Sequence, residues 1–297
     1  MISGTTTASA AGTWTLGDRT VNRLGFGAMR LSGTGGMGRG EDRDPEQSAA
    51  VVRRAVELGV NHIDTAGFYF SVSGRANEII RAALAPYPDD LTVATKVGPG
   101  RDLVTGEWGD WVTPAHLREH VEHNLESLGL DRLHVVNYRS NGRDDVPAAA
   151  AALAALKDEG LLDHIGLSNV GVEALRAARE VTDVVCVQNR HAAGYERADG
   201  GDVLAACLEA GIAFVPFFSI AARSREGAAE ESSDVVAEIA DRHRATPAQV
   251  RIAWTLALGP HLLAIPGTGS VDHLEQNVAA AALELSAEEL ERISALG

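Results

Sequence analysis

The chain has 297 residues, 45% of them hydrophobic and 23% charged, which is enough to bury one large core. Its 41 acidic and 26 basic side chains give a formal net charge of −15 at pH 7, which disfavours nucleic acid as a partner. Both cysteines lie in apolar stretches without CxxC spacing, which is typical of a reducing compartment. With neither a signal-peptide pattern nor a bilayer-length apolar run, the sequence predicts a soluble cytoplasmic protein that does not enter a membrane.

The pattern of elements predicts an α/β fold. An N-terminal hairpin with its turn at Gly17-Asp18 is followed by alternating β-rich runs and helical patterns. Strands are expected near residues 23–28, 60–64, 91–96, 132–138, 163–167, 183–188, 212–217 and 262–265. These units indicate a (β/α)8 TIM barrel with two extra helices, at 230–243 and in the C-terminal SAEELERISAL. We expect one barrel domain over residues 1–297, with residues 1–12 as a flexible tail.

The run GTGGMG at residues 33–38 has the G-x-G-x-x-G spacing of a Rossmann fingerprint. That fingerprint needs a helix that starts at its last glycine, so that free N–H groups face a pyrophosphate. Here the next helix is expected only at Asp44, as its N-cap, and Pro45. We therefore interpret the run as a loop after the first strand, bordering the active site.

Residues capable of chemistry follow the second and third expected strands, where barrel enzymes place their catalytic groups. Asp64 ends the second strand, Tyr69 follows it, and Lys96 ends the third; the only other lysine is Lys157. A tyrosine phenol with its ordinary pKa of about 10 donates its proton more readily beside a fixed cation. We expect Lys96 to be that cation, held by Asp64, in a site that protonates a carbonyl oxygen as hydride reaches the carbon.

The later strands also end in polar or aromatic residues. These residues are Asn137, Arg139, Ser168, Asn169, Gln188 and Phe217. Arg139 is expected at the active site, and its alternative role is a structural ion pair with an acid such as Asp144. Trp108 and Trp111, in the loop after Lys96, either line the substrate site or pack within that loop. HLREH at 116–120 matches an inverted zinc-peptidase pattern, but its helix is expected on the outside of the barrel, so no metal site is predicted.

Seven segments, in order over nearly the whole chain, resemble those of the aldo-keto reductases. They are LGFGAMRL, AVELGVNHIDTAGFYF, VATKVG, LESLGLDRLHVVN, IGLSNV, VQNR and IPGTGSVDHLEQN. The resemblance implies the (β/α)8 fold and NAD(P)H-dependent carbonyl reduction without metal or flavin. It also implies that Asp64, Tyr69 and Lys96 belong to a catalytic tetrad in which Tyr69 is the acid.

The same resemblance implies a cofactor site along the strand ends. Ser168, Asn169 and Gln188 would hold the nicotinamide carboxamide, and Phe217 would stack on its ring. Pyrophosphate would lie near the segment from Gly267 to Ser270, and adenosine near the helix that follows. The full implied set is Gly27, Met29, Arg30, Asp64, Ser168, Asn169, Gln188, Phe217, Gly267, Thr268, Gly269, Ser270, His273, Gln276 and Asn277.

The chain departs from the family pattern at two sites, the fourth tetrad position and the 2′-phosphate site. Arg139 stands where the fourth tetrad member is usually histidine; it cannot relay a proton, but it can bind a carbonyl or an anionic group. Gly267 and His273 stand where a lysine and an arginine commonly bind the 2′-phosphate. NADPH is still the expected cofactor, because Thr268, Ser270 and His273 can bind phosphate, and NADH remains open.

The VVN-x-R strand end and the later VPFF resemble the branch that contains the pyridoxal reductases. The sequence therefore predicts an NADPH-dependent carbonyl reductase acting on a small aldehyde or ketone, with pyridoxal-type aldehydes as the leading class. We expect a monomer or a weak homo-oligomer. Two alternatives remain: a redox-neutral epimerase or dehydratase of a specialised metabolite, and a non-catalytic NADPH-binding sensor subunit.

Overall fold

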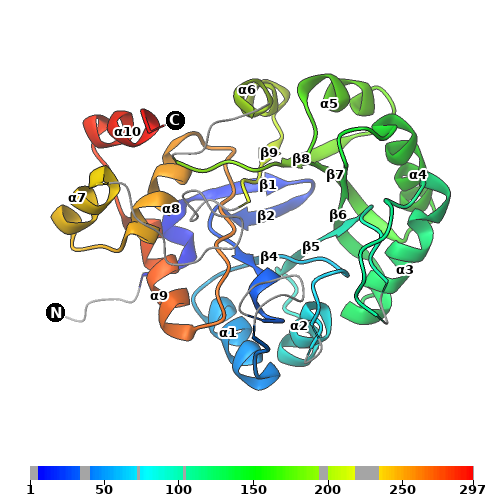
Figure 1. The fold of residues 1–297 in the computed structure, drawn as a ribbon, viewed down its shortest axis with the longest axis horizontal. Coiled ribbons are helices and arrows are strands. Elements are labelled where there is room, and N and C mark those ends of the chain that lie inside the picture. Colours follow the sequence, from blue (N-terminus) through cyan, green and yellow to red (C-terminus); the bar gives the residue numbers. More distant parts are fainter. Residues whose placement is uncertain are drawn as a thin grey trace.

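The computed structural model describes residues 6–33, 41–71, 74–102, 105–193, 200–217 and 234–296. Its centre is a curled parallel sheet whose seven strands neighbour one another in chain order (Figure 1). They are β3 (Phe26–Gly27), β4 (His62–Asp64), β5 (Thr92–Val97), β6 (Leu133–Arg139), β7 (Leu162–Ser168), β8 (Val184–Gln188) and β9 (Ala213–Phe214). Each expected strand up to residue 217 is present, although the first and the seventh are shorter than predicted.

The expected eighth strand closes the sheet, but only through isolated bridges. Leu262 pairs in parallel with Phe214 of β9, and Ala264 pairs in parallel with Leu24, just before β3. The N–H of Leu263 donates to the Phe214 carbonyl at 3.0 Å, and that of Gly25 donates to the Ala264 carbonyl at 2.8 Å. Because this segment joins both edges of the sheet, the predicted (β/α)8 barrel is confirmed.

Helices surround the sheet (Figure 1). They are α1 (Pro45–Glu57), α2 (Ala76–Leu84), α3 (Leu117–Leu128), α4 (Val146–Asp158), α5 (Val172–Arg179), α6 (Gly200–Ala210), α8 (Pro247–Ala257) and α9 (Val271–Ala279). Helix α1 begins as its sequence predicts: Pro45 occupies the first turn, and the Asp44 carboxylate accepts a hydrogen bond from the Glu46 N–H. This late start places the glycine run outside the helix, although residues 34–38 of that run lie outside the described residues.

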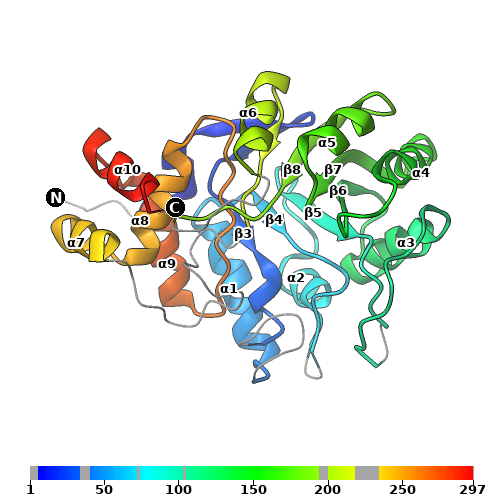
Figure 2. The same ribbon diagram turned by 45° about the horizontal axis from the view of Figure 1, so that its top comes forward.

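The two extra helices lie beside α8 on the outside of the barrel (Figures 1 and 2). They are α7 (Asp234–His243), whose predicted residues 230–233 lie outside the described part, and α10 (Ala287–Ser294). A separate apolar cluster joins them to α8 through Val236, Trp254 and Ile293. A capping box between Ser286 and Glu289 begins α10.

The hairpin β1 (Thr13–Leu16) and β2 (Arg19–Asn22) closes the amino-terminal end of the barrel. Leu16 and Val21 pack against the inward-facing residues of the sheet, and Arg19 donates to the Thr92 hydroxyl at the start of β5 at 3.0 Å. Before the hairpin, residues 8–11 form a 3-10 helix in which Ala8 is buried. The expectation of a flexible tail up to residue 12 is therefore wrong for residues 8–11.

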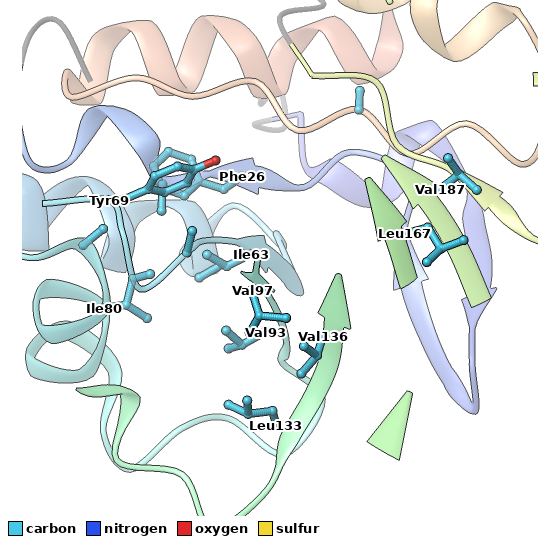
Figure 3. Packing of buried hydrophobic residues seen from close by; sticks show 14 of the residues in the cluster. Phe26, Ile63, Tyr69, Ile80, Val93, Val97, Leu133, Val136, Leu167 and Val187 are labelled. Carbon is cyan, nitrogen blue, oxygen red and sulfur yellow. The ribbon is translucent and has the colours of Figure 1, made fainter. Parts of the chain in front are cut away.

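Strand alternation positions the site. Outward-facing residues such as Val93, Val97 and Val136 pack under the helices (Figure 3). Inward-facing residues change from apolar to polar along β5 and β6, where Ala94 precedes Lys96 by two positions and Val135 precedes Asn137 likewise. The polar groups therefore collect inside the barrel at the carboxyl ends of the strands.

Among the helices of the described ranges, none is long and apolar enough to cross a membrane.

Candidate active site

A buried ion pair joins the ends of β4 and β5. The Lys96 Nζ lies 2.6 Å from Asp64 Oδ1, and the two side chains are 2% and 7% exposed. Lys96 also donates to the Thr65 carbonyl at 2.9 Å, and the other Asp64 oxygen accepts from Gln188 Nε2 at 2.7 Å. A buried charge is tolerated only when it is paired and hydrogen-bonded, and this pair meets both conditions.

Tyr69 lies against this pair. Its ring centroid is 5.0 Å from the Lys96 Nζ, and its side chain is 6% exposed. Burial by itself lowers the pKa of Lys96, but the charges of Asp64 and Tyr69 and their hydrogen bonds outweigh it and raise that pKa above its ordinary value. The three residues predicted as a catalytic unit are therefore together, with a charged ammonium beside the tyrosine.

The segment after β4 holds Tyr69 by its backbone. The Tyr69 N–H donates to the Ala66 carbonyl at 3.0 Å, and its carbonyl accepts from Ala76 at the start of α2 at 2.9 Å. The ring of Phe68 meets it edge to face at 5.2 Å. Tyr69 belongs to the same buried apolar cluster as Phe26, and both are labelled in Figure 3.

Arg139 ends β6 with a half-buried side chain, and its guanidinium carbon is 5.6 Å from the ring centroid of Phe217. Asp144 instead accepts hydrogen bonds from the hydroxyls of Tyr138 and Ser140. Within the described part of the chain, no carboxylate pairs with Arg139. The alternative of a structural ion pair with Asp144 is therefore wrong, and Arg139 brings a positive charge to this end of the barrel that no described carboxylate pairs with.

Two buried polar atoms without partners mark the ends of β7 and β8. Among the residues that the structure describes, the Ser168 Oγ and the Gln188 Oε1 have no hydrogen-bond partner, although the Gln188 Nε2 donates to Asp64. A buried polar atom left unpaired is costly, so each of these two atoms is available to a water molecule or to a bound ligand. Asn169 follows Ser168 with φ at 61°, and its Nδ2 donates to the Ser140 carbonyl at 2.9 Å.

The segment before α9 approaches β3 closely. A Cβ on Gly27 would lie 2.6 Å from the Ile265 carbonyl oxygen, and one on Gly267 would lie 2.5 Å from that of Gly27. Only glycine permits this contact between the two backbones. Next to it, the Ser270 hydroxyl caps α9 by accepting from the His273 N–H, which leaves N–H groups of the first turn facing outward.

A family model for the aldo/keto reductases matches residues 23–297. The chain belongs to the aldo/keto reductase family. It is therefore an NAD(P)H-dependent oxidoreductase, as its sequence predicts.

Relatives of this reductase cover nearly all of it. It is 42% identical over 297 residues to a pyridoxine 4-dehydrogenase of Escherichia coli strain K12. This match covers 97% of this chain and 99% of the relative. Among solved structures, the thermostable aldo-keto reductase Tm1743 in complex with the inhibitor epalrestat has 28% identity, coverage of 96% and 99%, and a TM-score of 0.79. A Klebsiella pneumoniae aldo-keto reductase in complex with NADPH has 25% identity, coverage of 96% and 94%, and a TM-score of 0.75.

The remaining predicted site residues of this reductase lie on two elements, the 3-10 helix after β3 and helix α9. Met29 and Arg30 are half-buried in a 3-10 helix after β3, Asn277 is buried in α9, and His273 and Gln276 are exposed on that helix. In the described ranges, no three His, Cys, Asp or Glu side chains are grouped to hold a metal ion.

The two tryptophans take different places in the loop after β5. The Trp111 Nε1 donates to the Arg139 carbonyl at 2.8 Å, which ties this loop to the end of β6. Trp108 is 43% exposed and meets the ring of Phe68 edge to face at 6.0 Å. Both therefore contact residues at or next to the predicted catalytic groups.

Arg43 is a candidate site residue that the sequence analysis missed. Its Nη1 donates to the Gly269 carbonyl at 3.1 Å, and its Nε is buried without a partner among the described residues. A Cβ on Gly269 would lie 2.2 Å from the guanidinium, so glycine at this position makes room for the arginine. Arg43 precedes the N-cap of α1 in a polar stretch, and nothing in that stretch signals a contact with residue 269.

Proposed function

We propose that this enzyme reduces the carbonyl group of a small aldehyde or ketone with NADPH, and that Tyr69 is the proton donor. The observation that carries the proposal is the buried Lys96–Asp64 pair with its ammonium 5.0 Å from the Tyr69 ring. A pre-arranged positive charge of this kind stabilises the negative charge that would develop on the phenol oxygen during proton transfer.

The residues present fit a nicotinamide cofactor. The unpartnered Ser168 hydroxyl and Gln188 carbonyl oxygen complement the donor and acceptor of a carboxamide. Gly27 and Gly267 keep their backbones clear of side chains, and Arg43 adds a cation beside the N-terminus of α9, where phosphates bind in many barrels. We propose that Arg43 contacts the 2′-phosphate. When bound, the reduced nicotinamide supplies the hydride.

The chain's own residues supply the proton and the orientation. The Tyr69 hydroxyl would donate a hydrogen bond to the substrate carbonyl oxygen and transfer its proton as that oxygen gains negative charge. Lys96 would stabilise the phenolate that remains, and Asp64 would hold Lys96 in place through the 2.6 Å contact. Gln188 would fix the second Asp64 oxygen, so the whole unit is pre-organised.

For the substrate we propose a polar aldehyde of the pyridoxal type. The 42% identical relative is a pyridoxine 4-dehydrogenase, and Arg139 places its guanidinium near Phe217 without a carboxylate partner among the described residues. A guanidinium binds two oxygens at once, which suits a carbonyl flanked by an ionised hydroxyl. Arg139 would therefore orient the substrate, whereas a proton relay through it is excluded because arginine stays charged.

The test is Tyr69→Phe, with Tyr87→Phe as its matched control. This control variant also loses one hydroxyl group. The Tyr87 hydroxyl donates to the Leu128 carbonyl at 2.7 Å and lies away from the carboxyl ends of the strands. We expect Tyr69→Phe to lose about 10²–10⁴-fold in kcat while it binds NADPH as the wild type does. Tyr87→Phe should keep its kcat. Full turnover by Tyr69→Phe would refute the proposed acid.

A further inference from the structure

Arg101, at the start of the loop after β5, reaches the segment that carries Tyr69. Its Nη1 donates to the carbonyl oxygens of Phe68, at 2.7 Å, and Phe70, at 3.0 Å. The carbonyl of Tyr69, between these two, accepts from Ala76 at 2.9 Å. Three consecutive carbonyl groups are therefore fixed, and one guanidinium fixes the two that flank Tyr69.

Aromatic rings hold this guanidinium in place. Its central carbon lies 3.8 Å from the ring centroid of Phe70 and 5.2 Å from that of Trp108. Arg75 lies over Phe70 as well, at 4.5 Å. The Arg101 Nε donates to the Gly106 carbonyl at 3.0 Å, so the side chain joins two turns of its own loop to the Tyr69 segment.

The environment of Arg101 is unusual for a cation. The residue is 9% exposed, and no carboxylate pairs with it within the described ranges. Burial, and in second place the charge of Arg75, lower the pKa of Arg101. Burying a charge without a counter-ion costs more than burying an apolar side chain of similar size, so packing alone does not account for an arginine here.

We infer that Arg101 is a positioning residue that fixes the backbone on both sides of Tyr69 and so holds its phenol at Lys96. This inference rests on the proposed role of Tyr69. Trp111, in the same loop as Arg101, donates to the Arg139 carbonyl and so joins this loop to the end of β6. The loop after β5 therefore connects the segment of the proton donor to the residue proposed to orient the substrate.

The experiment compares Arg101→Met and Arg101→Lys with Arg23→Met. Arg23 is the matched control, because it also donates to backbone carbonyls, those of Ala11 at 3.2 Å and Gly259 at 2.5 Å, but at the opposite end of the barrel. A displacement of about 1 Å at a reacting group can cost 10²-fold, so we expect Arg101→Met to lower kcat roughly 10–100-fold. The NADPH dissociation constant should stay at the wild-type value. Arg101→Lys should recover part of the rate, because an ammonium can reach one of the two carbonyls that flank Tyr69. It lacks the several N–H donors with which the guanidinium also reaches the Gly106 carbonyl.

A second readout separates positioning from general destabilisation. If Arg101 acts through the phenol, Arg101→Met should raise the solvent deuterium isotope effect on kcat, and it should cost no further rate in a Tyr69→Phe background. Arg23→Met should lower the unfolding midpoint without changing the solvent deuterium isotope effect on kcat or the rate in the Tyr69→Phe background. Should Arg101→Met fail to fold, Arg101→Lys carries the same comparisons.

Two outcomes would overturn the inference while the proposed function stands. One is wild-type kcat in the folded Arg101 variants, with Tyr69→Phe inactive. The other is an equal loss of rate from Arg101→Met with and without the Tyr69 hydroxyl. Full turnover by Tyr69→Phe itself would overturn both the proposed acid and the role of Arg101.

Discussion

Replacing Lys96 by methionine tests the energetics of the buried pair directly. The substitution keeps an unbranched apolar stem but leaves the Asp64 carboxylate, 7% exposed, with Gln188 Nε2 as its remaining side-chain donor. Breaking a buried pair by removing one partner costs about 3–5 kcal/mol, because a charge stays buried without compensation. We expect Lys96→Met to lose about that much unfolding free energy at pH 7.

The assay is urea denaturation followed by fluorescence of the four tryptophans, with Lys157→Met as the control. Lys157, the other lysine of the chain, lies half-buried in the last turn of α4 and forms no ion pair within the described residues. Its substitution should change stability by less than about 0.5 kcal/mol. The double variant Asp64→Asn/Lys96→Met should lose less than Lys96→Met alone, because it removes both charges.

The pH dependence has a definite sign. Since the pKa of Lys96 is raised in the folded state, its contribution is complete below the unfolded lysine pKa of about 10.4 and is lost as pH rises past the folded value. The difference between wild type and Lys96→Met should therefore be constant from pH 7 to 9. Equal stability of Lys96→Met and Lys157→Met would refute the reasoning, as would a double variant that is less stable than Lys96→Met.

Three further predictions concern Arg139, Arg43 and His62. Arg139→Gln should raise KM about tenfold or more for aldehydes with an ionised hydroxyl beside the carbonyl, because a charge-assisted hydrogen bond is lost; steady-state kinetics that show an equal change for plain benzaldehyde would contradict this. Arg43→Gln should weaken NADPH binding about tenfold and leave NADH binding unchanged, measured by cofactor fluorescence; equal weakening of both would indicate contact with the pyrophosphate instead. Burial lowers the pKa of His62 to about 4 in the folded state, so on acidification this imidazole is protonated in the unfolded state at a higher pH than in the folded state. The free energy of unfolding should therefore fall by about 3 kcal/mol between pH 6.5 and 4. His62→Gln should flatten that part of the stability curve in acid urea titrations, and an unchanged slope would rule out His62 as its source.

Local patterns in the sequence were sufficient to predict the barrel and the group at its centre. Asp64 and Lys96 follow short apolar runs, and strand alternation turns both inward, so their meeting follows from parallel pairing in register. The hairpin turn at Gly17-Asp18 and the cap at Asp44 were predictable for the same reason, because each depends on adjacent residues. The eighth strand is reduced to bridges at Leu262 and Ala264, and its length depends on both edges of the sheet.

Contacts made by long side chains across loops could not be predicted. Arg43 reaches Gly269 and Arg101 reaches Phe68 from segments without a periodic pattern, and each contact depends on how two loops pack. The isolation of Arg139 was equally hidden, because Asp144 is close in sequence but is satisfied by Tyr138 and Ser140. The sequence thus predicted Asp64 and Lys96, which strand register holds, and Tyr69 shortly after β4, but it did not predict the loop contacts of Arg43 and Arg101.

The most direct test of the central claim is the stoichiometry of the reaction of the wild-type enzyme with NADPH and pyridoxal. Loss of the reduced-nicotinamide absorbance is followed alongside chromatographic measurement of the alcohol formed. If the enzyme is a carbonyl reductase, we expect one NADPH to be oxidised for each alcohol molecule formed. Simple aromatic aldehydes should be reduced more slowly than pyridoxal. Binding of NADPH without its oxidation by pyridoxal or any other aldehyde or ketone tested, or conversion of a substrate without net loss of NADPH, would contradict the account.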